Sequence, residues 1–338
     1  MLKPATVRSD SASLLVLSPT EMEIAPFTDL ARFARAGDVW VVNDAATFPA
    51  SLAGRTDRGE AIELRLLPRR PGTTGPWEAV AFGAGDWRMR TEDRPAPTLA
   101  LGDRLRFSGN VSGIVATRSP LSDRLIACDF GLSEAETWAM IYRIGNPVQY
   151  SYLPEALAIW SVQTPFAARP WATEMPSAGR PLEWSRLREL RAAGAELHFL
   201  THATGLSSTG DSTLDSALPL PEFFDIPEPT VSAIRRAKTR GSRVIAVGTS
   251  VTRALEGSTL AHGTLRPGLG ETALKIDASY PHRVVNGILT GLHSPGESHF
   301  ELLRSFLPRE RFAKAESLAE KYALRTHEFG DASLVLSA

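Results

Sequence analysis

The chain has 338 residues, of which 43% are hydrophobic and 22% charged, a composition that argues against a disordered or membrane-embedded protein. This length exceeds what one ordinary core supports, so we expect two domains, or one large domain with an insertion. The formal net charge of -1 argues against a diffuse positive field for nucleic acid, although it allows a local basic face.

The first part of the chain predicts a strand, a turn, a helix and a second strand. Residues 11–19 form a β-rich run that closes at a proline turn. Residues 26–37 carry apolar side chains at helical spacing and end at Gly37, a favourable helix C-cap. Residues 38–44, DVWVVND, are a short and almost continuously apolar strand. Such strands are typically covered on both faces, as in α/β sheets.

The pattern of predicted secondary structure changes between Ser51 and Phe130. Short strand-like runs are separated there by Gly, Pro and Asp, and no helix of convincing length intervenes. This pattern predicts a small antiparallel β-barrel or sandwich. We therefore expect an α/β body with a parallel-type sheet, formed by residues 1–54 and 131–338, and an inserted antiparallel β-barrel domain formed by residues 55–130.

After the predicted barrel, the sequence again predicts alternating helices and strands. A helix over residues 133–145 begins with a capping box of Ser133 and Glu136. Residues 146–181 are rich in Pro, Trp and Tyr and predict a long irregular loop, of the kind that is usually functional or partly disordered. A helix–Gly–strand unit then occurs twice in succession, as parallel βα folds require. A strand around residues 283–293 and helices around 298–306 and 316–324 complete the chain.

The most informative segment is VIAVGTSVTRALEGS. A buried strand, residues 244–247, leads into Gly248, Thr249 and Ser250, and we expect a helix to start near Thr252. Ligands of open parallel sheets bind beyond the carboxyl ends of the strands, and a helix N-terminus favours an anion or a polar ligand edge. Arg253 adds a positive charge in the first turn. The alternative is an ordinary βα turn with capping hydroxyls.

Two further strand ends carry polar residues. Asn43 and Asp44 end the first buried strand, and the hydroxyl-rich loop LTHATGLSSTGDST after another strand offers His202, Thr204, Gly205, Ser207 and Ser208. Because parallel strands end at one sheet edge, these residues can line one crevice. A solvated loop and a simple Asx turn are the structural alternatives.

A third polar segment, GLHSPGESHFELL, places His293, Glu297, Ser298 and His299 just before a helix. Glu297 and Ser298 can simply cap that helix. The spacing is not H-E-x-x-H, so we expect no metal site. The residues alone therefore predict a polar crevice at the carboxyl edge of a sheet, with His and Glu side chains suited to proton transfer.

The same segments, in the same order, resemble the S-adenosylmethionine:tRNA ribosyltransferase-isomerase family of queuosine biosynthesis. VIAVGTSVTRALE is similar to that family's VIAVGTTSVRxLE, and GDVWVVNDAATFPASLAGR to GDLLVxNNTRVIPARLxGR. MPSAGRPL resembles APTAGLHF, RVVNGILTGLHSPGES resembles KVVDALxTNFHLPxS, and FGDASLVL resembles YGDAMxI. The similarity spans nearly the whole chain. The chain is therefore identified as a divergent member of this family. The resemblance implies an α/β body with an inserted β-barrel.

The resemblance also implies a reaction. The family transfers the ribosyl carbons of S-adenosylmethionine, its co-substrate, to the aminomethyl group of 7-aminomethyl-7-deazaguanine at the wobble position of a tRNA, without a metal. The product is epoxyqueuosine, and adenine and methionine are released. A base must remove the acidic C–H beside the sulfonium, an acid helps adenine to leave, and the attacking amine must be neutral. Each proton transfer contributes roughly 100- to 10,000-fold in rate.

Matching positions supply the candidate site residues. His293 and Glu222 are expected to be the main proton-transfer groups, with His202 as a further candidate and Arg253 as a positioning charge. The alternative is that Glu222 only pairs with Arg253 and that His293 caps the following helix. The residues expected to bind substrate are Asn43, Gly179, Thr201, Gly205, Gly248, Thr249, Arg253, Ser298 and Asp331.

The chain also departs from the family pattern. Ala46 and Ser51 stand where the family motif has arginines, Arg180-Pro181-Leu182 follow Gly179 in place of LHF, and Leu220 and Phe223 flank Glu222 where the family has His and Tyr. Guanidinium groups are the usual phosphate clamps, so we expect weaker tRNA binding. A paralogue that combines S-adenosylmethionine with a small-molecule acceptor is therefore an alternative function. A non-enzymatic RNA-binding relative is a third.

Compartment signals point to the cytoplasm. The single cysteine, Cys128, excludes an intrachain disulfide and a cysteine-based zinc site. The first residues contain no sustained apolar run, and no stretch approaches the roughly 18 apolar residues of a membrane span. We therefore expect a cytoplasmic protein with no membrane partner.

Overall fold

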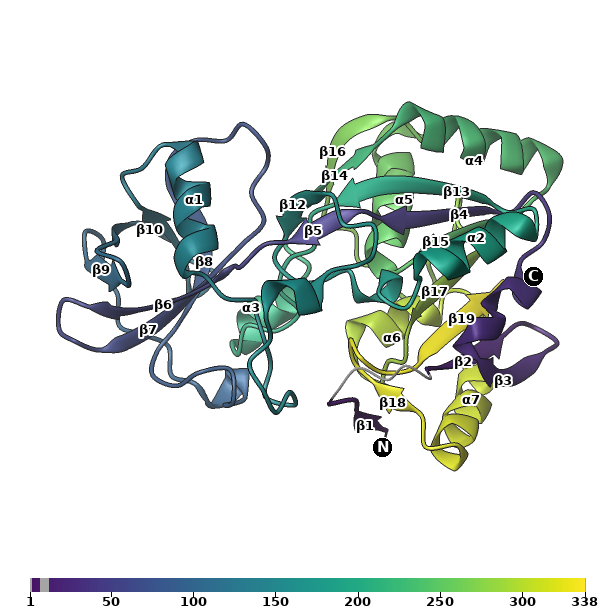
Figure 1. Ribbon diagram of the computed structural model, residues 1–338, viewed down its shortest axis with the longest axis horizontal. Helices are drawn as coiled ribbons and strands as arrows, with labels where there is room; N and C mark the ends of the chain where they lie inside the picture. The colour runs from purple at the N-terminus through teal and green to yellow at the C-terminus, as the bar shows by residue number, and fades with distance from the viewer. Residues whose placement is uncertain (1, 7–11, 338) are drawn as a thin grey trace.

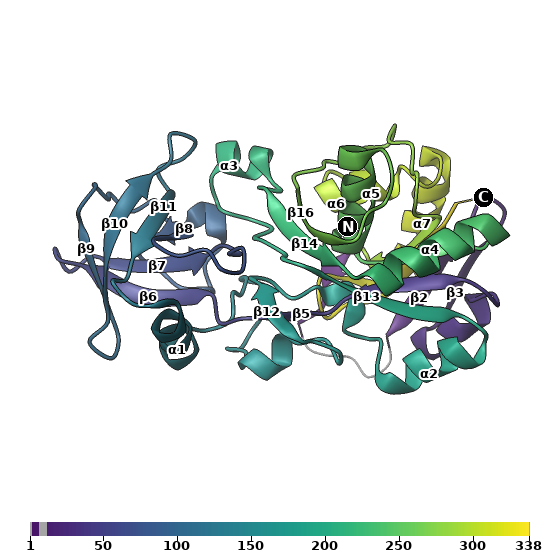
Figure 2. The same cartoon turned by 90° about the horizontal axis from the view of Figure 1, so that it is seen from above.

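The computed structural model describes residues 2–6 and 12–337 and shows an α/β body beside a β-barrel (Figures 1 and 2). The body is built on a nine-stranded sheet. In spatial order its strands are β16 (Gly268–Thr272), β14 (Glu222–Ile226), β13 (Glu196–His202), β4 (Val39–Asn43), β15 (Val244–Val247), β17 (Gly287–Gly291), β19 (Ala332–Leu336), β2 (Ser13–Leu17) and β3 (Met22–Pro26).

The centre of this sheet is parallel, as expected. Strand β4 pairs in parallel with β13 and β15, and β15 pairs in parallel with β17. The margins add antiparallel pairs: β14 with β13 and β16 on one side, β17 with β19 and β2 with β3 on the other. The expected fold class is thus confirmed, with a mixed rather than purely parallel sheet.

Helices cover both faces of the sheet (Figure 2). The α-helices are α1 (Glu134–Ile144), α2 (Trp184–Ala192), α3 (Ser212–Ala217), α4 (Glu228–Arg240), α5 (Thr249–His262), α6 (Ser298–Leu303) and α7 (Arg309–Lys321). Side chains alternate across a strand, and in β4 Val39 and Val41 join the core under α4 and α5, whereas Trp40 and Val42 join the core under α2. This double coverage explains why the strand is apolar at every position but its last.

The barrel closes in the order β10-β11-β8-β7-β6-β9. Its strands are β6 (Ser51–Thr56), β7 (Ala61–Leu66), β8 (Trp77–Phe82), β9 (Arg104–Phe107), β10 (Ser112–Arg118) and β11 (Leu125–Asp129). Between residues 55 and 130 the only helical element is the 3-10 turn η2 (Thr91–Asp93). Helix α1, with the expected capping box, packs Met140 and Ile141 into the barrel core. The domain boundaries at 55 and 130 stay a prediction.

The chain enters and leaves the barrel at one place. Strand β4 continues through β5 (Ala45–Thr47) into β6, and Ser51 forms two backbone hydrogen bonds with Asn146, each 2.9 Å long. Strand β5 also pairs in parallel with β12 (Arg169–Ala172). The outgoing and returning chains are thus bonded to each other beside the sheet.

Local expectations differ from the structure in three places. Residues 26–37 do not form an α-helix: β3 forms a hairpin with β2, and only a 3-10 helix, η1 (Phe27–Phe33), follows, because Pro26 and Ala34 are extended and leave room for little more than two turns. Helix α5 starts at Thr249 rather than near Thr252. The expected loop over residues 146–181 contains η3 (Ile159–Val162), β12 and η4 (Ser177–Gly179).

Two minor features complete the fold. A short parallel pair joins β1 (Lys3–Pro4) to β18 (Arg325–Thr326). None of the helices in the described part of the chain combines the length and the apolarity that a membrane crossing needs.

Candidate active site

Asn43 joins three strand ends at the carboxyl edge of the sheet. Its Nδ2 donates to the backbone oxygen of His202 at 3.0 Å and to Oγ of Ser250 at 3.4 Å, and its Oδ1 accepts from the backbone nitrogen of His202 at 2.9 Å. The ends of β4, β13 and β15 therefore form one edge, as expected from the sequence. The buried amide of Asn43 is engaged in holding this edge, so substrate binding by Asn43 stays a prediction.

Glu222, Arg253 and His202 form a buried cluster at this edge. Glu222 begins β14, and the antiparallel pairing with β13 places it beside His202. Its Oε2 pairs with Nη2 of Arg253 and lies 3.5 Å from Nε2 of His202, while its Oε1 accepts from the backbone nitrogen of Gly205 at 2.7 Å. The Glu222–Arg253 pair anticipated in the structural alternative is therefore present.

The cluster keeps polar atoms without partners. Among the described residues, the two ring nitrogens of the buried His202 have no hydrogen-bond partner. The same holds for Nε of Arg253. Burial lowers the pKa of His202 to about 4; the Glu222 carboxylate opposes this shift and the Arg253 charge adds to it. The ring is thus neutral near pH 7. Buried polar groups normally have partners, so these atoms are available to a polar ligand.

The N-terminus of α5 lies next to the cluster. Gly248 is the N-cap residue and has φ = +95°, a conformation that L side chains rarely adopt. A Cβ atom at Gly248 would lie 3.3 Å from Cβ of Ala178 in η4, so glycine also permits this close approach. Thr249 is half-buried at the first helical position. Free N–H groups at this end favour a negative or polar ligand group.

His293 lies beyond β17, in the turn before α6. Its Nε2 is 3.1 Å from Oγ1 of Thr290, its Nδ1 is 3.6 Å from Oε2 of Glu297, and its ring centroid is 4.9 Å from that of His299. The N-cap residue of α6 is Glu297, so His293 does not cap this helix. Ser298 is exposed at the first position of α6.

His299 was not among the expected site residues. It interacts electrostatically with both His293 and Arg253 of the cluster. Burial lowers the pKa of His299 well below its usual value, and the charges of His293 and Arg253 lower it further. In the sequence, the only indication of a role for His299 was its position six residues after His293. The same segment also predicted the start of a helix.

Other expected residues have structural contacts. Thr201 donates from Oγ1 to Asp44 at 2.5 Å. Asp331 accepts from the backbone nitrogens of Ser13 at 2.6 Å and Arg325 at 2.7 Å, and these bonds tie β2 to β18. At Gly179 a Cβ atom would lie 2.8 Å from the ring of Phe166. Roles of these residues in substrate binding remain predictions.

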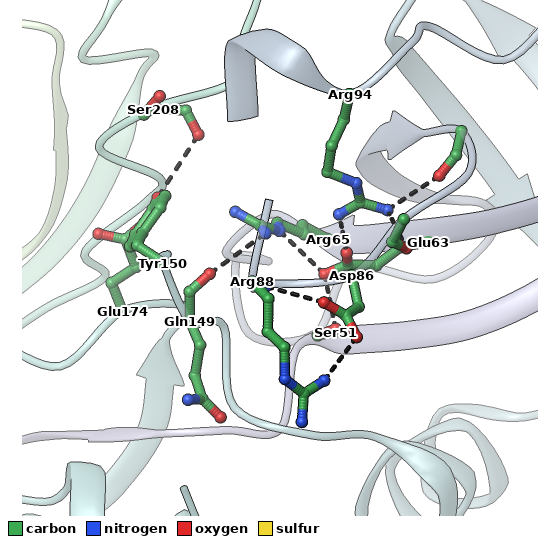
Figure 3. Close-up of polar contacts among 12 residues, drawn as sticks. Ser51, Glu63, Arg65, Asp86, Arg88, Arg94, Gln149, Tyr150, Glu174 and Ser208 are labelled. Carbon is green, nitrogen blue, oxygen red and sulfur yellow. Dashed lines mark hydrogen bonds and ion pairs between the residues drawn. The ribbon is translucent and has the colours of Figure 1, made fainter. Parts of the chain in front are cut away.

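Sequence reasoning missed a second carboxyl group near the edge (Figure 3). Glu174, just after β12, accepts from the hydroxyl of Tyr150 and from the backbone nitrogen of Ser207 at 3.0 Å. Burial raises the pKa of Glu174 to about 7. Both Glu174 and Tyr150 belong to the Tyr- and Pro-rich segment 146–181, whose length and composition were its only signal.

The barrel contributes a buried arginine cluster, also drawn in Figure 3. Glu63 accepts from Nε of Arg65 at 2.9 Å, from Nη1 of Arg94 and from the hydroxyl of Ser51 at 2.7 Å. The guanidinium groups of Arg65 and Arg94 also lie 4.5 and 4.9 Å from the ring centroid of Phe82. Ser51 thus lies beside two guanidinium groups, but these are buried and do not form an exposed phosphate clamp.

Acid–base side chains converge at this sheet edge, and in the described residues no group of three or more His, Cys, Asp or Glu could hold a metal ion. Fold and site together define an α/β protein with an adjoining β-barrel and with His, Glu and Arg side chains gathered at the carboxyl edge of the sheet. The model of the Queuosine biosynthesis protein family matches residues 2–335, and the chain belongs to this family.

Similar proteins carry a specific name. The S-adenosylmethionine:tRNA ribosyltransferase-isomerase of Acaryochloris marina is 33% identical over 345 residues, covering 98% of this chain and 88% of that protein. The protein of the same name from Thermus thermophilus is 31% identical over 334 residues, covering 97% and 93%. The crystal structure of an S-adenosylmethionine tRNA ribosyltransferase from Thermotoga maritima, at 2.00 Å resolution, has a TM-score of 0.51 and 22% identity, covering 99% and 95%. That structure supports the fold.

Proposed function

We propose that the protein is an S-adenosylmethionine-dependent tRNA ribosyltransferase-isomerase. It transfers the ribosyl carbons of S-adenosylmethionine to 7-aminomethyl-7-deazaguanine in tRNA, which gives epoxyqueuosine and releases adenine and methionine. Family membership across residues 2–335 and the names of the relatives support this activity. The observation that carries it is the buried Glu222–Arg253–His202 cluster at the carboxyl edge of the sheet.

The geometry supports distinct roles for the cluster residues. Arg253 and the N–H of Gly205 hold the Glu222 side chain in position at the sheet edge, within reach of His202, where it can take part in proton transfer. His202 is neutral near pH 7 and has unpartnered ring nitrogens, so it can exchange a proton with a ligand. His293 supplies a further ring at the end of β17. S-adenosylmethionine lies along the ends of β4, β13 and β15, with a polar edge at the N-terminus of α5.

A small-molecule acceptor is the second candidate function. The observation that favours it is that position 51 is a serine whose hydroxyl bonds to Glu63, and that position 46 is an alanine. Two expected phosphate contacts are thereby absent. The sheet-edge cluster serves either acceptor, because the chemistry at S-adenosylmethionine is the same in both.

The test is product release. We expect purified protein to release adenine and methionine from S-adenosylmethionine when tRNA bearing 7-aminomethyl-7-deazaguanine is added, and not when unmodified tRNA is added. Release without tRNA, upon addition of a small primary amine, would support the second candidate. No release under any of these conditions would refute the enzyme assignment.

A further inference from the structure

A cavity of about 550 Å³ lies between the segment 153–165 and Phe329. Its volume suits a small organic ligand. Trp160, with 78% of its surface exposed, lies at its wall and offers an aromatic face. Thr164 also lines it; this residue is only 4% exposed, and its Oγ1 has no partner in the described part of the chain. A buried hydroxyl without a partner beside a cavity indicates a site for a polar ligand.

A second, smaller cavity of about 20 Å³ adjoins the first and shares Leu153, Leu157 and Phe329 with it. We call it the annex. About 10–15 Å³ of such volume holds one water molecule, so the annex has room for one small polar group. Its polar walls are Thr47, Tyr150, Glu174 and Glu328.

Two carboxyl groups line the annex, and the Arg65 guanidinium interacts electrostatically with one of them, Glu174. Glu174 accepts from the hydroxyl of Tyr150, and Glu328 accepts from the hydroxyl of Tyr152. Neither carboxyl group forms an ion pair with any described residue, and their mutual repulsion adds to the burial that raises the pKa of Glu174. Buried carboxylates are normally paired with a positive charge. A cationic group of a ligand would provide the ion pair that neither carboxyl group has.

The annex is connected to the sheet-edge cluster through one loop. The backbone nitrogen of Ser207 donates to Glu174 at 3.0 Å, and that of Gly205 donates to Glu222 at 2.7 Å. The backbone nitrogen of Thr173 donates to the oxygen of Thr204 at 2.8 Å in the same loop. A ligand bound in the annex is therefore held close to the site of the proposed reaction.

We propose that the two cavities form one binding site for a ligand with a primary amine, whose ammonium group binds in the annex to Glu174 and Glu328. The larger cavity receives the remainder of the ligand, against Trp160 and Thr164. The inference rests on the proposed function, because both substrates of that reaction carry a primary amine. These are the α-amino group of S-adenosylmethionine and the aminomethyl group of the acceptor base, which must release its ammonium proton before it attacks.

The test compares ligand pairs that differ only in the amine. Calorimetry measures binding of S-adenosylhomocysteine and its analogue without the α-amino group, and of 7-aminomethyl-7-deazaguanine and its 7-methyl analogue. Glu174→Gln and Glu328→Gln keep the hydrogen-bond acceptors for the tyrosines. Glu310→Gln is the matched control, because Glu310 is exposed at the start of α7 and lines neither cavity.

We expect both annex variants to weaken the amine-bearing member of one pair at least tenfold, to leave its amine-free partner within about twofold, and to match wild type in circular dichroism. The affected pair identifies the source of the amine. Equal effects on both members of each pair, effects as large in Glu310→Gln, or no binding of either amine by wild type would overturn the proposal. Amine-dependent binding in a protein that never releases adenine would refute the proposed function alone.

Discussion

The pH dependence of stability provides a direct test of the environment of Glu174. Burial, together with repulsion from Glu328, raises the pKa of this carboxyl from 4.5 to about 7, against the opposing hydrogen bonds from Tyr150 and Ser207. The folded state therefore binds more protons than the unfolded state between these values. The free energy of unfolding must fall as the pH rises from about 4.5 to about 7. Glu174→Gln carries no titrating proton and removes this contribution.

The size of the effect follows from the two pKa values. A difference of about 2.5 pH units, at about 1.4 kcal/mol for each unit, gives an upper limit of about 3.5 kcal/mol. Glu174 is partly exposed to the annex, so solvent reduces the effect below this limit. The quantity to compare is the free energy of unfolding of Glu174→Gln minus that of wild type. We expect this difference to be more positive above pH 7 than at pH 4.5.

Urea unfolding at several pH values between 4.5 and 8 measures this effect. Subtracting the wild-type free energy from that of Glu174→Gln cancels the other titrating groups, and the difference should rise through the window and then level off. A difference for Glu174→Gln that is independent of pH would refute the argument that this carboxyl titrates near neutrality.

Three further predictions concern the sheet-edge site and tRNA. His293→Ala should reduce adenine release at least roughly a hundredfold with almost unchanged affinity for S-adenosylmethionine, the pattern of a group that acts in the transition state; near-normal turnover would move the assignment to His202. Burial holds the pKa of His202 at about 4, below its usual 6.5, so the unfolded state binds more protons and stability is lost as the pH falls from 6.5 to about 4. Urea midpoints at pH 7 and pH 5 should show that His202→Gln lacks this loss, and an equal loss in both proteins would contradict the burial argument. Binding to a queuosine-type tRNA should show a salt slope shallower by about one for each arginine absent at positions 46 and 51 than in a relative that keeps both, and a slope as steep as the relative's would disprove the expected weakness.

Parts of the molecule that depend on local pattern could be predicted from the sequence. The continuous apolar run of β4 indicated a strand covered on both faces, and Ser133 and Glu136 indicated the start of α1. The strand ends carrying Asn43, His202 and Gly248 could be placed on one edge because parallel strands share their polarity. In each case the signal lies within a few residues of the element that it specifies.

Features that depend on packing between distant segments could not be predicted. The apolar spacing of residues 26–37 suits an α-helix, but pairing of β3 with β2 uses the preceding residues and leaves only η1. No signal beyond the composition of segment 146–181 pointed to Glu174, since its environment is created by Tyr150 and by Ser207 from another loop. Asp331 matches a family motif, yet its carboxylate is engaged with two backbone nitrogens, a role that no pattern of residue types specifies.

The hydrogen-bonded pair of Ser51 and Asn146 has a consequence for the modularity of the chain. The two points where the polypeptide passes between the body and the barrel are held in register, so the intervening segment closes on itself with its ends in contact. Segments with adjacent ends are readily exchanged between proteins, because their removal leaves a gap that a short linker spans. The barrel with α1 therefore has the chain connectivity of an inserted domain, which recombination could exchange while the strand ends of the body stay in place.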